Sequence, residues 1–259
     1  MTAKNFEERL KSYQADIFPV VPFKKTDRLL LIHFTEKNNQ LTAEILDNTD
    51  IFIKYINAKL NEAGARYGIG GYKEHRTIYS RSKLFGANSS GFTEGVNLKS
   101  TDKLTGEIDH NPESLKNEPR RIHLGIDIWG KPYTKVMAPF NGIVHSFAFN
   151  NAFGDYGTTI VLVHNLDGLI FHTLYGHLSL NSIKNMQEGD MVMKGDVFAE
   201  FGIPFENGHW PPHLHFQIIQ DMHGMKGDYP GVCKYSEKEY YLENSPDPDL
   251  ILQMMQYVK

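Results

Sequence analysis

The sequence has almost no cysteine: one residue of 259, Cys233, carries a thiol. A single cysteine excludes an intrachain disulfide, and with it the small secreted domains that depend on several disulfides. No catalytic cysteine–histidine context surrounds Cys233, so we expect an inert thiol. Long hydrophobic runs are also lacking. RLLLIHF, the longest apolar stretch near the N-terminus, is far shorter than the roughly 20 residues of a membrane helix, and no membrane span is expected.

The sequence has no excess of basic residues either: 27 lysines and arginines face 31 acidic residues, and the formal net charge is −4. Because nucleic-acid binding depends on cationic side chains that neutralise phosphates, we expect no nucleic-acid partner. The N-terminal stretch MTAKNFEERLKSYQADIF has a charge every few residues, whereas a signal peptide has an apolar core. We therefore expect a cytoplasmic protein, or a periplasmic or extracellular one if an export segment has been removed.

The composition that remains is that of a globular protein with a substantial core: 41% of the residues are hydrophobic and 12% are aromatic. The first third mixes helix and strand signals. Three elements are expected there: a helix over residues 5–17, a strand over residues 29–34, and a helix that begins at a cap, Asn48 or Thr49, and ends at Gly64. The glycines of the following YGIGGY are expected to form turns.

Residues 120 to about 220 consist of short β-branched and aromatic segments separated by turn dipeptides. Asp167-Gly168 lies between two apolar runs, as the turn of a β-hairpin does, and Asn141-Gly142 is a second strong turn signal. This pattern predicts an antiparallel β core. The expected fold class is α+β, mainly β, with an N-terminal α/β extension packed on the antiparallel sheet.

Three segments are expected along the chain: an N-terminal extension with a loop-rich part (residues 1–119), the β core (residues 120–222), and a C-terminal extension that ends in a helix (residues 223–259). The loop-rich part covers about residues 89–121, which are polar and weakly periodic. Near the C-terminus, apolar residues recur at helical spacing: Leu250, Ile251, Met254, Met255 and Val258. Core packing or a homodimer contact would explain that spacing.

Histidines are the chemically informative residues. His123 and Asp127 are four residues apart, and an extended strand would place both side chains on one face. His213 and His215 share a face of another expected strand, and His177 ends a third apolar segment. Imidazole nitrogens and carboxylate oxygens are zinc ligands, and catalytic zinc sites combine three protein ligands with water. Further neutral histidines can act as general base or hydrogen-bond donors, so the three motifs together predict a metal site.

At these residues the sequence resembles the M23 family of zinc metallopeptidases, the lysostaphin-type or LytM-type endopeptidases. HLGID, LYGHL and HLHF match the family motifs in their order along the chain. The resemblance implies a fold of the duplicated-hybrid-motif type with a groove in its β-sheet core. It also implies one zinc ion per chain with His123, Asp127 and His215 as ligands, and His177 and His213 as the catalytic histidines.

The resemblance covers residues 120–220, and two departures from the family pattern occur within it. Gln217 stands where glutamate is common, and the stretch FENGHWPP precedes His213. This region looks closer to M23-like domains of cytoplasmic proteins, fused between a kinase-like domain and an aminotransferase. Those domains imply no particular substrate, so specificity for peptidoglycan does not follow from the resemblance.

Three further residues are expected at a substrate groove. His209 and Trp210 belong to the stretch before His213, where two prolines stiffen the backbone, and would form a wall that narrows the groove. The alternative for Trp210 is packing on the sheet. Arg121, next to the first expected ligand, could bind a substrate carboxylate.

The function that follows is a zinc-dependent metallopeptidase that hydrolyses peptide bonds in a peptide or a peptidoglycan-like substrate. The alternative is a zinc- or ligand-binding module of cytoplasmic metabolism without peptidase activity. A third hypothesis is a regulatory protein that uses the groove for interactions without metal.

Overall fold

The computed structural model describes residues 3–86 and 118–258 of the chain. Most of the expected loop-rich part, residues 89–117, lies outside the described residues. Within the described residues, no helix has the length and apolarity needed to span a membrane.

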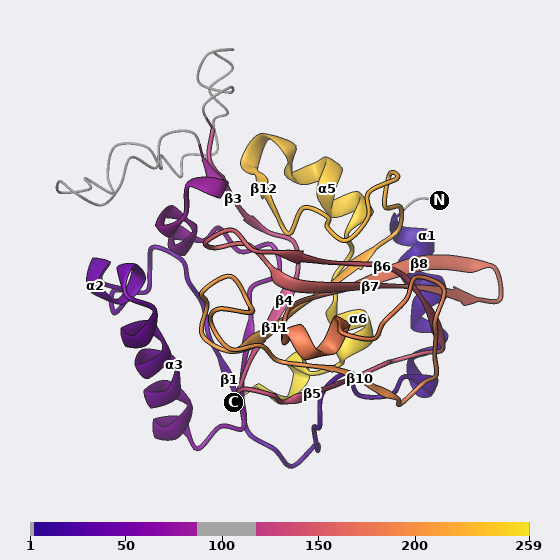
Figure 1. Cartoon of the computed structure of the whole chain (residues 1–259), viewed down its shortest axis with the longest axis horizontal. Helices are drawn as coiled ribbons and strands as arrows, with labels where there is room; N and C mark the ends of the chain where they lie inside the picture. The colour runs from indigo at the N-terminus through magenta and orange to yellow at the C-terminus, as the bar shows by residue number, and fades with distance from the viewer. Residues whose placement is uncertain (1–2, 87–117, 259) are drawn as a thin grey trace.

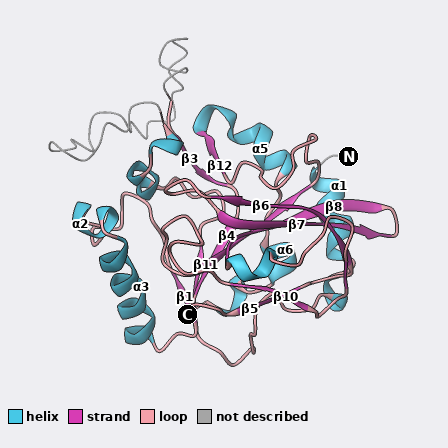
Figure 2. Cartoon of the chain, viewed as in Figure 1, coloured by secondary structure: helices cyan, strands magenta, loops and turns pink. Residues whose placement is uncertain are grey.

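One sheet of eight strands organises the molecule (Figure 2). In spatial order its strands are β1 (Leu29–Leu31), β2 (Tyr67–Gly70), β4 (Ile126–Trp129), β11 (His213–Ile219), β8 (Leu169–Leu178), β7 (Gly157–Leu166), β6 (Gly142–Asn150) and β9 (Met191–Val192). Neighbouring strands are antiparallel from β2 to β9, whereas β1 and β2 are parallel. Two small sheets pair β5 (Lys135–Met137) with β10 (Val197–Glu200) and β3 (Arg120–His123) with β12 (Val232–Lys234). The mainly β, antiparallel fold expected from the sequence is confirmed.

The longest strands, β7 and β8, form a hairpin whose turn is Asp167-Gly168, as the dipeptide predicts. Both turn residues have positive φ, 48° and 79°, which suits a tight turn between twisted antiparallel strands. Asn141-Gly142 has a different role, because Gly142 begins β6 and the chain does not reverse there into a hairpin.

The helices lie around the sheet (Figure 1). They are α1 (Ala3–Lys11), α2 (Ala43–Asp47), α3 (Thr49–Ala63), α5 (Lys238–Asn244) and α6 (Asp249–Leu252). Short 3₁₀ helices cover Gln14–Asp16, Thr77–Arg81, Lys83–Phe85, Leu180–Ile183, Tyr235–Glu237 and Met255–Tyr257. Figure 1 shows α1 beside β8 and α3 on the opposite side of the molecule.

The helix expected after Asn48 is confirmed as α3. The Asn48 side chain accepts hydrogen bonds from the amides of Asp50 and Ile51, and Gly64 ends the helix with φ 57°. The helix expected over residues 5–17 is shorter than its periodicity indicates: α1 ends at Lys11 and a separate 3₁₀ turn follows.

The N-terminal extension contributes strands to the main sheet. The connection from β1 to β2 runs through α3, because parallel strands require a long crossover. The expectation that YGIGGY forms only turns is wrong, since Tyr67–Gly70 is strand β2. A Cβ at Gly68 would overlap the Ile32 side chain, so glycine at this position permits close packing. The sheet therefore continues across the expected boundary at residue 119.

The C-terminal segment packs on the core through fewer helical turns than expected. The α6 helix ends at Leu252, and Gln253 adopts a left-handed conformation with φ 50°. The Asp249 carboxylate accepts hydrogen bonds from the amides of Met254 and Met255, which stabilises this change of direction. Core packing is the role of the buried apolar residues here: Leu250, Ile251, Leu252 and Met254.

Candidate metal centre

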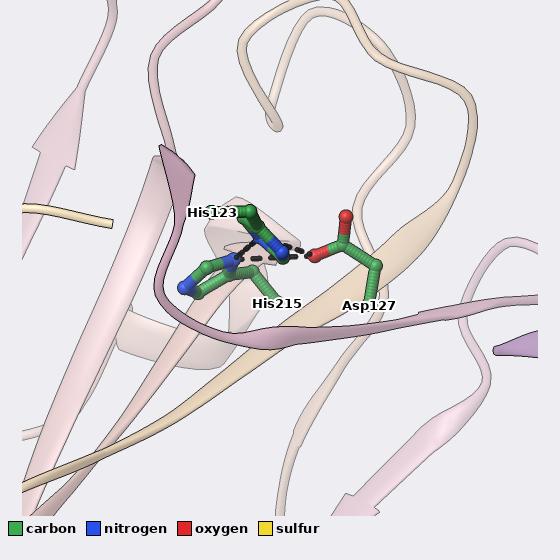
Figure 3. Close-up of side chains that lie close together, drawn as sticks. All are labelled: His123, Asp127 and His215. Atoms are coloured by element: carbon green, nitrogen blue, oxygen red, sulfur yellow. Dashed lines mark hydrogen bonds and ion pairs between the residues drawn. The ribbon is translucent and has the colours of Figure 1, made fainter. Parts of the chain in front are cut away.

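Three side chains from distant parts of the sequence converge in the middle of the molecule (Figure 3). His123 Nε2 lies 2.9 Å from His215 Nδ1, and Asp127 Oδ1 lies 3.3 Å and 3.2 Å from these two nitrogens. All three side chains are buried. Two imidazole nitrogens and one carboxylate oxygen facing one point form a donor set that suits zinc. These residues are the three expected metal ligands.

The strands bring these ligands together in a way that the sequence did not predict. His215 on β11 is directly opposite Asp127 on β4. His123 and Asp127 do not share one extended strand, as their spacing suggested: β3 ends at His123 and β4 begins at Ile126. The chain changes sheets in between, and a Cβ at Gly125 would overlap the His215 ring. Gly125 therefore allows the close approach of this ligand.

Hydrogen bonds determine which nitrogen of each ligand faces the donor cluster. His123 donates from Nδ1 to the carbonyl of Gly71 (2.9 Å), which leaves the lone pair of Nε2 free. His215 donates from Nε2 to Gln217 Oε1 (3.0 Å), which leaves Nδ1 free. The Gln217 amide is oriented by its own donation to Pro230 O and Ser245 Oγ. Glutamine in place of the family's common glutamate thus orients a ligand in this chain.

The two expected catalytic histidines lie beside the donor cluster. Their rings stack with centroids 4.1 Å apart, and His213 Nε2 lies 4.0 Å from Asp127 Oδ1. His177 donates from Nδ1 to the carbonyl of Asn207, and His213 donates from Nδ1 to that of Pro211, each at 2.8 Å. In both rings Nε2 is therefore the unprotonated nitrogen that can accept a proton.

Burial sets the protonation states of these groups. It lowers the pKa of His123 to about 3 and that of His213 to about 4, and it lowers the pKa of His177 well below the ordinary value. Burial alone would raise the pKa of Asp127, but His123 and Arg76 hold it well below its usual value. Neutral imidazoles and an ionised carboxylate are the states that bind a metal cation.

The backbone at His177 has a left-handed conformation, φ 63°, which is uncommon for a residue with a side chain. Two hydrogen bonds fix it: its amide donates to Tyr156 O, and its carbonyl accepts from the amide of Gly202, both at 2.8 Å. Such conformations persist where surrounding contacts determine them, and they are frequent at functional sites.

A cavity of about 240 Å³ gives access to the donor cluster. Its lining includes all five expected metal-binding and catalytic residues, with Tyr156 and Arg120. The N-terminal extension supplies part of the wall through Arg76, Ile78, Tyr79, Leu84 and Phe85, and residues 228–232 supply another part.

The three expected groove residues have different positions. Trp210 lines the cavity and is also packed between Tyr79 and Phe52, with the Arg81 guanidinium 4.7 Å from its ring centre, so the wall and core interpretations both hold. His209 is not among the lining residues; its ring stacks on Phe153. Arg121 is not a lining residue either and donates to the carbonyl of Arg120. The part that these three residues take in substrate binding stays a prediction.

Sequence reasoning missed two residues that hold the site. Arg76 donates from Nη1 to Asp127 Oδ2 (2.5 Å) and is buried. Asn207, whose carbonyl orients His177, also donates from its amide to Gly202 O and Trp210 O. Neither residue belongs to a metal-site motif, so the sequence gave no chemical signal for them.

A buried two-histidine, one-carboxylate cluster within an antiparallel sheet is the kind of centre that β-sheet metallohydrolases have. Residues 121–227 match the model of peptidase family M23, and the five site residues fall within this range. The resemblance expected from the sequence is thereby confirmed for this part of the chain. Among curated proteins, no match was found.

Solved structures of peptidases superimpose on parts of the chain. The catalytic domain of the antimicrobial peptidase lysostaphin from Staphylococcus simulans is 25% identical, covering 47% of this chain and 80% of that domain, with a TM-score of 0.33. For the catalytic domain of the prophage-encoded M23 protein EnpA from Enterococcus faecalis the values are 20%, 42%, 79% and 0.33. For a zinc-containing peptidase from Vibrio cholerae they are 24%, 53%, 34% and 0.31.

Proposed function

We propose that the protein is a zinc-dependent peptidase that hydrolyses peptide bonds with His123, Asp127 and His215 as zinc ligands. The observation that carries this proposal is the convergence of three donor atoms within 4.8 Å of one another in the lining of a cavity. The M23 family match over residues 121–227 supports peptide hydrolysis as the reaction. The choice of zinc rests on the donor set, since two imidazoles and a carboxylate leave a ligand position for water.

A bound zinc ion would polarise a scissile carbonyl and lower the pKa of a bound water towards about 7. The histidines of this chain supply the proton transfers. His177 and His213 present an unprotonated Nε2 to the cavity, so either can accept a proton from the attacking water. The imidazolium formed can then donate a hydrogen bond to the oxyanion or its proton to the leaving amine.

The walls of the cavity favour a short peptide or a chain end as substrate. Side chains of the N-terminal extension, among them Tyr79 and Phe85, line the cavity opposite residues 228–232. A volume of about 240 Å³ suits a few residues of peptide and leaves little room for a cross-linked network. We propose short peptides as the substrate class, with peptidoglycan-like fragments as the closest alternative.

Metal removal tests the proposal. We expect the chelator-treated protein to lose hydrolysis of one or more members of a peptide panel and to regain it when zinc is added. The panel contains glycine-rich peptides, peptides with D-amino acids, ordinary L-peptides and intact peptidoglycan, each followed by mass spectrometry. If zinc-loaded protein cleaves no member, peptidase activity is wrong and a zinc-binding module without activity remains. If cleavage persists in the metal-free protein, the metal mechanism is wrong.

A further inference from the structure

The turn of residues 71–76 holds the first metal ligand from outside the segment that matches the family. The Gly71 carbonyl accepts the His123 side-chain hydrogen bond. The His123 amide donates to the carbonyl of Glu74, and its carbonyl accepts from the amide of Lys73, each at 3.0 Å. Backbone and side chain of this ligand are therefore both fixed by the N-terminal extension.

The same turn holds the second ligand through Arg76. The guanidinium donates from Nη1 to Asp127 Oδ2 at 2.5 Å and from Nε to Glu74 Oε2 at 2.7 Å. Its remaining contacts are Tyr79 Oη at 3.3 Å and the Gly70 carbonyl at 3.4 Å. With 2% of its surface exposed and its donors engaged by protein atoms, Arg76 is arranged to hold Asp127 rather than to bind a substrate.

We propose that Arg76 is a positioning residue of the metal centre: it occupies Oδ2 of Asp127, so that Oδ1 alone binds the metal. This inference rests on the proposed function insofar as the site binds zinc. A carboxylate without such a partner can rotate and present both oxygens to a metal, which changes the coordination number. The residues that complete the centre thus extend beyond residues 121–227 to the turn of residues 71–76.

The charge of Arg76 must be separated from its hydrogen bond. A cation next to a metal ligand weakens metal binding by repulsion, but Glu74 carries the opposite charge 2.7 Å away. Removing Arg76 alone would leave two neighbouring buried carboxylates and could strengthen metal binding for that reason. The double variant Glu74→Gln with Arg76→Met removes a neutral pair, so the loss of the hydrogen bond to Asp127 dominates its effect.

We expect the double variant to bind zinc about 10–100-fold more weakly, the usual cost of losing an outer partner of a metal ligand. Zinc affinity is measured by competition with a chromophoric chelator, and Co²⁺ absorption reports the coordination number. The Co²⁺ bands should weaken as Asp127 becomes bidentate, a change that a merely structural role would not produce. Arg76→Lys, which keeps the charge and one donor, should restore much of both the affinity and the bands.

A second variant displaces Arg76 without removing it. Gly71 has φ 108°, and a Cβ there would overlap the Arg76 guanidinium, so Gly71→Ala should also weaken zinc binding. Gly168→Ala is the matched control, since Gly168 has φ 79° but no neighbour within 4 Å of an added Cβ. If the double variant does not fold, as judged by circular dichroism of the metal-free protein, Gly71→Ala and Arg76→Lys decide the question.

The inference is overturned if the folded variants bind zinc like the wild type and give the same Co²⁺ spectrum. If the wild type cleaves peptides with zinc while these variants are unchanged, only the role of Arg76 is wrong. If the wild type itself binds no zinc, the proposed function and this inference both fall.

Discussion

His215→Ala is expected to lose the metal, with zinc affinity falling by more than the roughly 10–100-fold cost of losing an outer partner. The substitution removes Nδ1, one of three converging donor atoms, and leaves two ligands, too few for the usual catalytic zinc site. Peptide hydrolysis should fall to background. Zinc content after dialysis and the competition assay measure the first effect, and cleavage of the best panel peptide measures the second.

The matched control for this variant is His164→Ala. His164 is also a buried histidine on a strand, but it hydrogen-bonds Thr173 and the carbonyl of Asn141, outside the cavity lining. This control should lower the free energy of unfolding, since it leaves polar partners unpaired, while zinc content stays at the wild-type level. Wild-type zinc affinity in His215→Ala would contradict the proposed ligand set.

His213→Ala should have the opposite combination of effects: zinc retained, and kcat lowered by about 10²–10⁴-fold, the usual contribution of a general acid–base group. Its Nε2 lies 4.0 Å from Asp127 Oδ1 and outside the group of three donors, so it faces the cavity beside the cluster. KM should change little, because the expected role concerns the proton and not binding of the peptide.

The comparison of the two variants on β11 is the informative part of this prediction. His213 and His215 lie on the same face of one strand, so a general disturbance of β11 would affect both variants alike. Should His213→Ala lose zinc to the same degree as His215→Ala, the division of roles between the two histidines is wrong.

The H-x-H strand is the part of the site that the sequence predicted most completely. Alternation along a strand places His213 and His215 on one face, and Leu214 and Phe216 enter the main core on the other. For His123 and Asp127 the expected convergence occurs, but the expected reason does not hold, because the chain leaves one sheet and enters another between them. A spacing of four residues does not reveal such a break.

The contacts that hold the site were beyond sequence reasoning for a physical reason. Arg76 and Asp127 are 51 residues apart, and His177 and Asn207 are 30 apart; only the packed fold brings them together. The orientation of His123 and His177 depends on backbone carbonyls, which every residue possesses and no motif encodes.

Element boundaries failed where one local contact outweighed periodicity. The apolar spacing of the C-terminal segment continues past Leu252, but the Asp249 carboxylate binds the amides of Met254 and Met255, and α6 ends. The glycines of β2 were assigned to turns because glycine usually weakens strands, whereas Gly68 is needed for the approach of Ile32.

The most direct test of the central claim is X-ray anomalous scattering at the zinc edge from crystals grown with zinc. The account predicts one strong peak about 2.0–2.2 Å from His123 Nε2, Asp127 Oδ1 and His215 Nδ1, the usual zinc–ligand distances for these atom types. No peak at this position in zinc-supplemented crystals, or a zinc ion bound by His177 and His213 instead, would contradict it.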